Sequence, residues 1–153
     1  MPSSCASTRR CDLKPFISPR NGHNSISSFV DFPPQDRILC VDDDSILLKL
    51  LVRSFQAHHF KVVTACNGID GLRQFQAYGG HFQAILTDND MPGMNGLEFV
   101  KQVRALSYKG RVLVMSANLM PSDYPAYQGH AVSGFFHKPF EINRVAAMLM
   151  QDH

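Results

Sequence analysis

The sequence predicts an α/β domain built on a doubly wound, five-stranded parallel sheet with helices on both faces. Three observations support this prediction. From residue 37 onward, short apolar runs recur along the chain, and each is followed by a stretch with helical amphipathic spacing. Each predicted helix joins one strand to the next, and repeated βα units imply a parallel sheet covered on both faces. A chain of 153 residues, 44% of them hydrophobic, is long enough for one ordinary core and short for two.

The five predicted strands are short and apolar, and the first four contain β-branched residues, which favour extended backbone. They span residues 37–41, 61–65, 84–87, 111–115 and 134–136.

The helices are predicted at residues 45–57, 68–78, 97–106 and 141–150. In the first of these, polar Ser45, Lys49 and Arg53 recur at intervals of four, apolar residues fill the opposite face, and Asp44 or Ser45 is a natural N-cap.

The segment between the fourth and fifth strands is poorer helix material. Pro121 and Pro125 remove amide donors, and Gly129 favours a helix end. We expect about two helical turns at residues 122–128.

Residues 1–36 differ in composition from the rest of the chain. They are dense in Ser, Pro and Asn and show no sustained period, so we expect a disordered N-terminal extension followed by one domain at residues 37–153. An organelle transit peptide is a weaker alternative, because no amphipathic helical stripe supports it. An extension without a role in folding, or an artefact of the assumed translation start, also stays open.

Charge and hydropathy exclude several classes of protein. The formal net charge is +2 and is not concentrated in either part of the chain, so we expect no nucleic-acid partner. No apolar run approaches the roughly 18 residues of a membrane span, and the first residues lack a charged-then-apolar pattern, so we expect no signal peptide. We therefore expect a cytoplasmic protein without a membrane partner.

The four cysteines show no C-x-x-C pairing, and two of them lie in strand-like apolar runs. We expect reduced, structural thiols at Cys5, Cys11, Cys40 and Cys66.

Acidic side chains follow two of the predicted strands. In a doubly wound sheet, reactive groups gather at the carboxyl ends of the strands, near the point where the strand order reverses. With the order 2-1-3-4-5, strands one and three are neighbours, so Asp42, Asp43 and Asp88 converge in one crevice. Three carboxylates repel one another unless a cation lies among them, and hard oxygen donors suit Mg²⁺.

A carboxylate can also act as a nucleophile toward phosphorus if the charge of the transferring phosphoryl group is neutralised. The Lys138 ammonium and the Ser116 hydroxyl, at the ends of strands five and four, can each bind one phosphoryl oxygen. Asp88 lies in the middle of this expected arrangement and is the residue we assign as phosphoryl acceptor. Asp88, Ser116 and Lys138 are thus the candidate catalytic residues.

Four motifs occur in register along residues 37–150: "VDDDS", "LTDNDMPGMNG", "VMSAN" and "FFHKPF". Any one of them is weak, but together they resemble the receiver domain of two-component, phosphorelay response regulators, of the single-domain chemotaxis-regulator-like type. The resemblance implies a flavodoxin-like receiver fold.

The resemblance also implies a role for each matching residue. Asp42, Asp43 and Asp88 resemble the Mg²⁺ ligands, and Asp90 would add its backbone carbonyl to the metal site. Asp88 resembles the phosphorylated aspartate. Lys138 resembles the lysine that is typically joined to its proline by a cis peptide.

Ser116 and Phe135 resemble the switch pair, in which the hydroxyl moves toward the phosphoryl group and the aromatic ring follows. Phe135 departs from the tyrosine often found at its position, and the proline-containing fourth helix departs from the usual charged helix, which puts family-type dimerisation on that face in doubt. Because Asp90 places an acid beside a site that attracts phosphate, we hypothesise an altered phosphoryl lifetime.

By resemblance, the chain is a signalling switch that accepts a phosphoryl group from a histidine kinase or a histidine phosphotransfer protein. We expect self-catalysed phosphotransfer and autodephosphorylation rather than an enzyme acting on a separate substrate. We expect no further domain after Met150, and therefore output through a downstream protein or a phosphotransfer partner. Lys49 and Arg53 on the first predicted helix are the expected docking edge for the kinase.

Three other interpretations stay open. Asp42–Asp44 is also compatible with a cluster of N-capping acids, and Asp88-x-Asp90 followed by Ser116 and Lys138 imitates the order of a phosphatase of the haloacid dehalogenase type. That class needs a further acidic pair after the lysine, which Glu141 and Asp152 do not supply. The third interpretation is a receiver-fold protein-binding module that works without phosphorylation.

Overall fold

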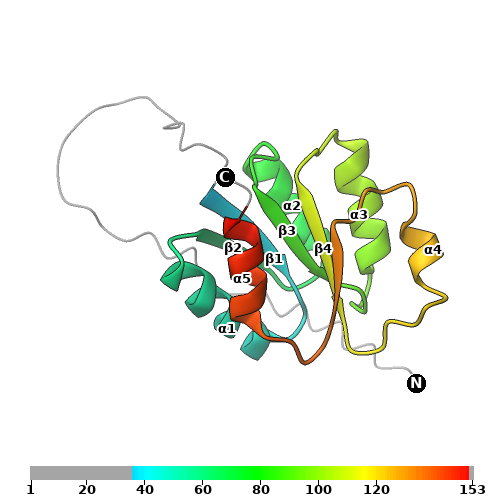
Figure 1. Cartoon of the computed structure of the whole chain (residues 1–153). Helices are drawn as coiled ribbons and strands as arrows, with labels where there is room; N and C mark the ends of the chain where they lie inside the picture. Colours follow the sequence, from blue (N-terminus) through cyan, green and yellow to red (C-terminus); the bar gives the residue numbers. More distant parts are fainter. Residues whose placement is uncertain (1–35, 152–153) are drawn as a thin grey trace, which may run out of the picture.

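Five short apolar segments form one parallel sheet in the order β2-β1-β3-β4-β5, as the sequence predicts (Figure 1). The computed structural model describes residues 36–151, so the disorder expected for residues 1–36 falls almost entirely outside the described residues, as do residues 152 and 153. The strands are β1 (Arg37–Val41), β2 (Lys61–Ala65), β3 (Ala84–Asp88), β4 (Arg111–Ser116) and β5 (Gly134–His137).

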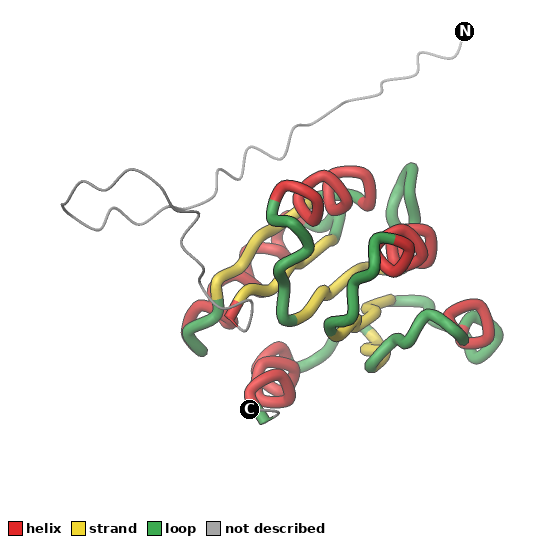
Figure 2. The backbone as a smooth tube through the Cα atoms, turned by 90° about the horizontal axis from the view of Figure 1, so that it is seen from above, coloured by secondary structure: helices red, strands yellow, loops and turns green. Residues whose placement is uncertain are grey.

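Helices cover both faces of the sheet, which Figure 2 shows as the middle of three layers. They are α1 (Ser45–Ala57), α2 (Gly68–Ala77), α3 (Gly96–Ala105), α4 (Tyr124–Tyr127) and α5 (Ile142–Met150). The core is split by the sheet: α1 and α5 pack in one half, and α2, α3 and the buried Tyr127 of α4 pack in the other. This is the doubly wound arrangement expected from the βα repeats.

The alternation of side chains along the strands explains the two halves of the core. In β1, Ile38 and Cys40 pack with α1 and α5, whereas Leu39 and Val41 pack with α2 and α3. Every residue of β1 beyond Arg37 is fully buried, which is why the strand is apolar without interruption.

The helices begin where side chains supply hydrogen-bond acceptors. The Asp44 carboxylate caps α1 by accepting from the backbone N–H groups of Ile46 and Leu47, which confirms one of the two predicted caps. Asn95 and Glu98 form a reciprocal capping box at the start of α3. Both caps lie at the carboxyl-terminal edge of the sheet, so they also fix the loops that follow β1 and β3.

The prediction of about two helical turns at residues 122–128 is wrong, because α4 has only the four residues Tyr124–Tyr127. The Asp123 carboxylate makes no cap bond to the helix and instead accepts from the backbone N–H of Met120, in the preceding loop. Pro125 lies in the first turn, and Gly129 ends the segment with φ 84°.

The other predicted boundaries agree with the structure to within one residue. β3, β4 and β5 each extend one residue further than predicted, to Asp88, Ser116 and His137. Cys40 and Cys66 are free thiols, as expected, whereas Cys5 and Cys11 lie outside the described residues. Within residues 36–151, no helix is long and apolar enough to cross a membrane.

Gly96 allows α3 to begin against the backbone of the residues that end β3. Its N–H donates to the carbonyl of Asn89 at 3.0 Å. A Cβ atom at this position would collide with the carbonyl oxygen of Asp88 and lie 2.8 Å from the Cα of Asn89. The loop between β3 and α3 therefore requires glycine for close approach rather than for a positive φ.

Replacing Gly96 by Ala should lower the free energy of unfolding by about 1–3 kcal/mol, because the backbone at the end of β3 has to move. Urea denaturation measures the change. Gly134→Ala is the matched control, because a Cβ there would lie 3.4 Å from the nearest atom, Leu113 Cδ2, which is ordinary contact. Equal stabilities of Gly96→Ala and wild type would contradict the close-packing argument.

Candidate functional site

The carboxyl-terminal edge of the sheet brings together the residues that the sequence predicts for the site. Asp42 follows β1, and its N–H donates to Ala65 O at the end of β2 at 3.0 Å. Asp88 and Ser116 are the last residues of β3 and β4. Lys138 follows β5, and its N–H donates to Ser116 O at 2.9 Å. Residues up to 96 positions apart in the sequence thus meet because β1, β3, β4 and β5 are consecutive in the sheet.

The Lys138 ammonium lies between two buried carboxylates. Its Nζ is 2.7 Å from Asp42 Oδ2 and 3.2 Å from Asp88 Oδ1. The peptide bond between Lys138 and Pro139 is cis, as the resemblance implies. Asp42 is also fixed by the backbone N–H of Asp44, which donates to its Oδ1 at 2.8 Å.

Asp42, Asp43 and Asp88 form one group of acids, as predicted. One carboxylate oxygen from each lies within 4.8 Å of the other two. Asp42 is fully buried and Asp88 is 4% exposed, whereas Asp43 is exposed to solvent. Three hard oxygen donors, two of them buried and one open to solvent, fit a divalent cation such as Mg²⁺ that keeps several of its waters.

Burial and mutual repulsion shift the protonation of this group. Burial, with the neighbouring charge of Asp42, raises the pKa of Asp88 from 3.8 to about 6, even though Lys138 acts in the opposite direction. Burial also raises the pKa of Asp42. Burial acts to lower the pKa of Lys138, but its hydrogen bond and charge interactions with the two acids outweigh this effect and raise it. The lysine is therefore charged, and its one charge does not compensate both buried acids.

Ser116 is buried, and its hydroxyl is held by two partners. Ser116 Oγ donates to Asp90 Oδ2 at 2.9 Å and accepts from the backbone N–H of Asn118 at 3.1 Å. The Asp90 side chain is thus engaged with the hydroxyl and is not part of the group formed by Asp42, Asp43 and Asp88. The expected contribution of the Asp90 carbonyl to a metal site stays a prediction.

Phe135 lies on the same face of the sheet as Ser116. Val114 is paired with Phe135 in the β4–β5 register, and Ser116 follows Val114 by two residues, so the side chains of Val114 and Ser116 point the same way. The half-buried ring of Phe135 packs edge-on against Tyr124 and Tyr127 of α4, at centroid distances of 4.7 and 5.4 Å. The hydroxyl and the aromatic ring therefore face the same short helix.

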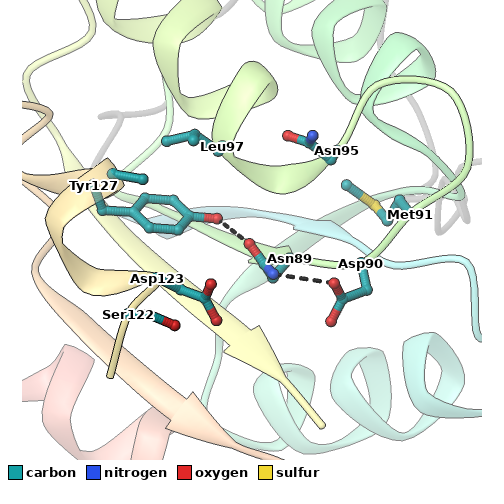
Figure 3. Close-up of a pocket in the computed structure, with 9 residues that line it drawn as sticks. Asn89, Asp90, Met91, Asn95, Leu97, Ser122, Asp123 and Tyr127 are labelled. Atoms are coloured by element: carbon teal, nitrogen blue, oxygen red, sulfur yellow. Dashed lines mark hydrogen bonds between the residues drawn. The ribbon is translucent and has the colours of Figure 1, made fainter. Parts of the chain in front are cut away.

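A cavity of about 420 Å³ is lined by the loop after β3, the start of α3, and α4 with the residues just before it (Figure 3). Across it, the Tyr127 hydroxyl donates to Asn89 Oδ1 at 2.5 Å, and Asn89 Nδ2 donates to Asp90 Oδ1 at 3.1 Å. Asn89 and Tyr127 are site residues that the sequence does not predict. They are 38 positions apart, and α4 has no clear helical stripe that would have indicated which of its side chains points to the site.

Neutralising Asp88 should stabilise the protein in the absence of divalent cations. Because the pKa of Asp88 is raised to about 6 from 3.8, the folded state binds its proton more tightly than the unfolded state, and stability is lost as the pH rises through that interval. Asp88→Asn should therefore raise the free energy of unfolding at pH 8 by about 1–3 kcal/mol.

Urea denaturation in the presence of a chelator measures this gain, which should shrink when the pH is lowered from 8 to 4.5. A destabilised Asp88→Asn at pH 8, or a gain that does not depend on pH, would contradict the electrostatic assignment.

Comparison with known proteins agrees with the architecture. The family model described as "Response regulator receiver domain" matches residues 38–150. Among curated relatives, the transcriptional regulatory protein PrrA of Mycobacterium tuberculosis is 33% identical over 111 residues, which cover 72% of this chain and 47% of PrrA. Schizosaccharomyces pombe transcription factor prr1 is 28% identical over 106 residues, which cover 69% of this chain and 19% of that protein. The chain thus spans less than half the length of these relatives.

Solved structures show the same fold. The chemotaxis protein CheY4 of Vibrio cholerae is 28% identical, with a TM-score of 0.68 over 74% of this chain and 94% of CheY4. A CheX–CheY complex of Borrelia burgdorferi, determined with BeF₃ and Mg²⁺, contains a chain that is 20% identical, with a TM-score of 0.69 over 77% of this chain and 96% of that one. Together with the sheet order and the acids at its carboxyl edge, the match over residues 38–150 shows that this chain belongs to the family of response regulator receiver domains.

Proposed function

We propose that the protein is a phosphorylation-dependent signalling switch that accepts a phosphoryl group on Asp88 in the presence of Mg²⁺. The observation that carries this proposal is the position of Asp88, which ends β3 beside the Lys138 ammonium and within a group of three carboxylates. A buried acid whose pKa is raised by burial and by a neighbouring charge is typical of functional sites, and phosphoryl-transfer sites bind a cation that neutralises phosphoryl oxygens.

The chemical step is an attack by a carboxylate oxygen of Asp88 on phosphorus. The new O–P bond gives an acyl phosphate, and the P–N bond of a phosphohistidine donor breaks, so the electron pair of that bond stays on the imidazole nitrogen. Lys138, whose Nζ is 3.2 Å from Asp88 Oδ1, would pair with one phosphoryl oxygen, and the Ser116 hydroxyl would turn from Asp90 to donate to another. The residues that would hold Mg²⁺ are Asp42, Asp43 and Asp88, and a bound ion supplies positive charge against the phosphoryl oxygens.

The same residues support self-catalysed phosphotransfer and hydrolysis. In this proposal the protein does not act on a separate substrate, because Asp88 itself both accepts the phosphoryl group and releases it to water. The upstream position of Asp42 and Asp43, which complete the group of acids, favours this function over the haloacid dehalogenase type of phosphatase. The solved CheX–CheY complex with BeF₃ and Mg²⁺ supports the proposal by its shared fold.

The output would arise on the face that Ser116 and Phe135 share. A hydroxyl drawn toward a phosphoryl oxygen leaves space beside Val114, and the half-buried Phe135 ring can enter that space. Because this ring packs against both tyrosines of α4, its movement would alter the surface formed by α4 and β5. A downstream protein would then bind one state of this surface more tightly than the other.

The phosphodonor is proposed to be a histidine kinase or a histidine phosphotransfer protein that docks on α1. Lys49 and Arg53 are exposed on this helix, as expected, and Ile46 and Leu50 beside them are 69% and 52% exposed. A surface that combines exposed apolar side chains with basic ones is suited to a protein partner.

Incubation with Mg²⁺ and a small phosphodonor, followed by mass spectrometry, tests the acceptor. Wild type should gain the mass of one phosphoryl group, whereas Asp88→Asn, or wild type in excess chelator, should gain none. If the wild type gains no phosphoryl group and shows no binding of beryllofluoride with Mg²⁺, the phosphorylation-independent binding module becomes the better account.

Charge reversal at both Lys49 and Arg53 should slow phosphotransfer from a histidine-phosphorylated donor protein roughly ten-fold, because it removes electrostatic attraction at the docking surface. Labelling by a small phosphodonor should not change, since that reagent needs no protein docking surface. The double variant Lys101→Glu, Lys109→Glu is the control, because both lysines are exposed on α3 or just after it. Equal slowing in the control and the α1 variant would remove the proposed docking edge.

A further inference from the structure

A continuous set of hydrogen bonds joins α4 to the Ser116 hydroxyl. The Tyr127 hydroxyl donates to Asn89 Oδ1 at 2.5 Å, and Asn89 Nδ2 donates to Asp90 Oδ1 at 3.1 Å (Figure 3). The other oxygen of the Asp90 carboxylate, Oδ2, accepts from Ser116 Oγ at 2.9 Å. Both Asp90 oxygens therefore have donors, one from Asn89 and one from the residue proposed to bind the phosphoryl group. We call these four side chains the Tyr127–Ser116 relay.

The Ser116 hydroxyl has only one proton to donate. Its oxygen already accepts from the backbone N–H of Asn118 at 3.1 Å, so the proton is directed at Asp90. A phosphoryl oxygen on Asp88 would need the same proton. Asp90 and the phosphoryl group therefore compete for it, and any contact that fixes the Asp90 carboxylate favours Asp90.

The Asp90 carboxylate stays on the Ser116 hydroxyl only if another contact restrains it. Asp90 is exposed, and an exposed carboxylate exchanges readily between protein and water partners. Asn89 restrains it from one side, and Tyr127 in turn restrains Asn89. Tyr127 is 3% exposed, and its ring is held against Phe135. The buried tyrosine is thus the fixed end of the relay.

The phenol of Tyr127 remains a donor over the whole physiological range. Burial, followed by the nearby charges of Asp90, Asp123 and Asp88, raises its pKa. The direction of the hydrogen bonds is therefore set. The phenol donates to the side-chain oxygen of Asn89, Oδ1, which leaves the side-chain nitrogen, Nδ2, to donate to Asp90.

We propose that Tyr127 and Asn89 are positioning residues, which hold the Asp90 carboxylate on the Ser116 hydroxyl and so oppose its transfer to a phosphoryl group on Asp88. This inference rests on the proposed function of Asp88. The bond between Tyr127 and Asn89 would connect α4 to the site, in addition to the contact between Tyr127 and the Phe135 ring.

The test is the affinity for beryllofluoride with Mg²⁺, followed by backbone amide NMR. Tyr127→Phe removes the hydroxyl and keeps the ring. It should lower the apparent dissociation constant roughly three- to ten-fold, which is the effect expected from losing one hydrogen bond that favours the unliganded state. Tyr124→Phe is the matched control, because its ring also packs on Phe135 but its hydroxyl is not part of the relay, and it should leave the constant unchanged.

A double-mutant comparison separates the relay from packing. In a Ser116→Ala background, no hydroxyl proton remains to compete for, so Tyr127→Phe should no longer change the affinity. If the effect of Tyr127→Phe persists in that background, Tyr127 acts through the packing of α4, and the relay is overturned. An unchanged affinity in Tyr127→Phe alone also overturns it.

The unliganded protein gives a second readout that does not depend on phosphorylation. Tyr127→Phe should shift the Asn118 amide resonance, because that N–H donates to the hydroxyl at the end of the relay, whereas Tyr124→Phe should not. An unshifted Asn118 resonance overturns the relay while leaving the role of Asp88 intact. A wild type that does not bind beryllofluoride overturns the proposed function, and with it the role of Tyr127 in phosphoryl binding.

Discussion

The ion pair of Lys138 with two buried carboxylates is the constraint on which the rest of the site depends. The ammonium lies 2.7 Å from Asp42 Oδ2 and 3.2 Å from Asp88 Oδ1, and it joins the loop after β5 to the ends of β1 and β3. One charge does not compensate both acids, and the pKa of Asp88 is raised to about 6 as a result of burial and of the charge of Asp42. The fold thus keeps an excess of negative charge at the position where a cation and a phosphoryl group would bind.

The parallel sheet connects its carboxyl-terminal edge with the surface formed by α4 and β5. Alternate residues of β4 and β5 point to the same side, so Ser116, Val114 and Phe135 all face α4. That helix is one turn long and is positioned by its tyrosine side chains rather than by a cap. A one-turn helix whose side chains contact both the Phe135 ring and Asn89 is a suitable reporter of a change at Asp88.

Local patterns were sufficient for the strands and for most helices, and the resemblance to receiver domains supplied the strand order. The rule that reactive groups gather at the carboxyl ends of parallel strands then predicted the group of acids. Apolar runs with β-branched residues located the strands, and the convergence of strand ends placed Asp42, Asp88 and Lys138 together. The fourth helix was predicted too long, because no pattern indicates that the Asp123 carboxylate turns back to Met120. The contact between Tyr127 and Asn89 was not foreseen either, since its geometry depends on where that irregular segment packs.

A calorimetric Mg²⁺ titration of the wild type at pH 6 and pH 8, in buffers with different ionisation enthalpies, tests the central claim most directly. If buried, repelling carboxylates create the site, Mg²⁺ should bind at both pH values and release a substantial fraction of a proton at pH 6, where Asp88 is partly protonated, but almost none at pH 8. Absence of Mg²⁺ binding, or binding without proton release at pH 6, would contradict the account.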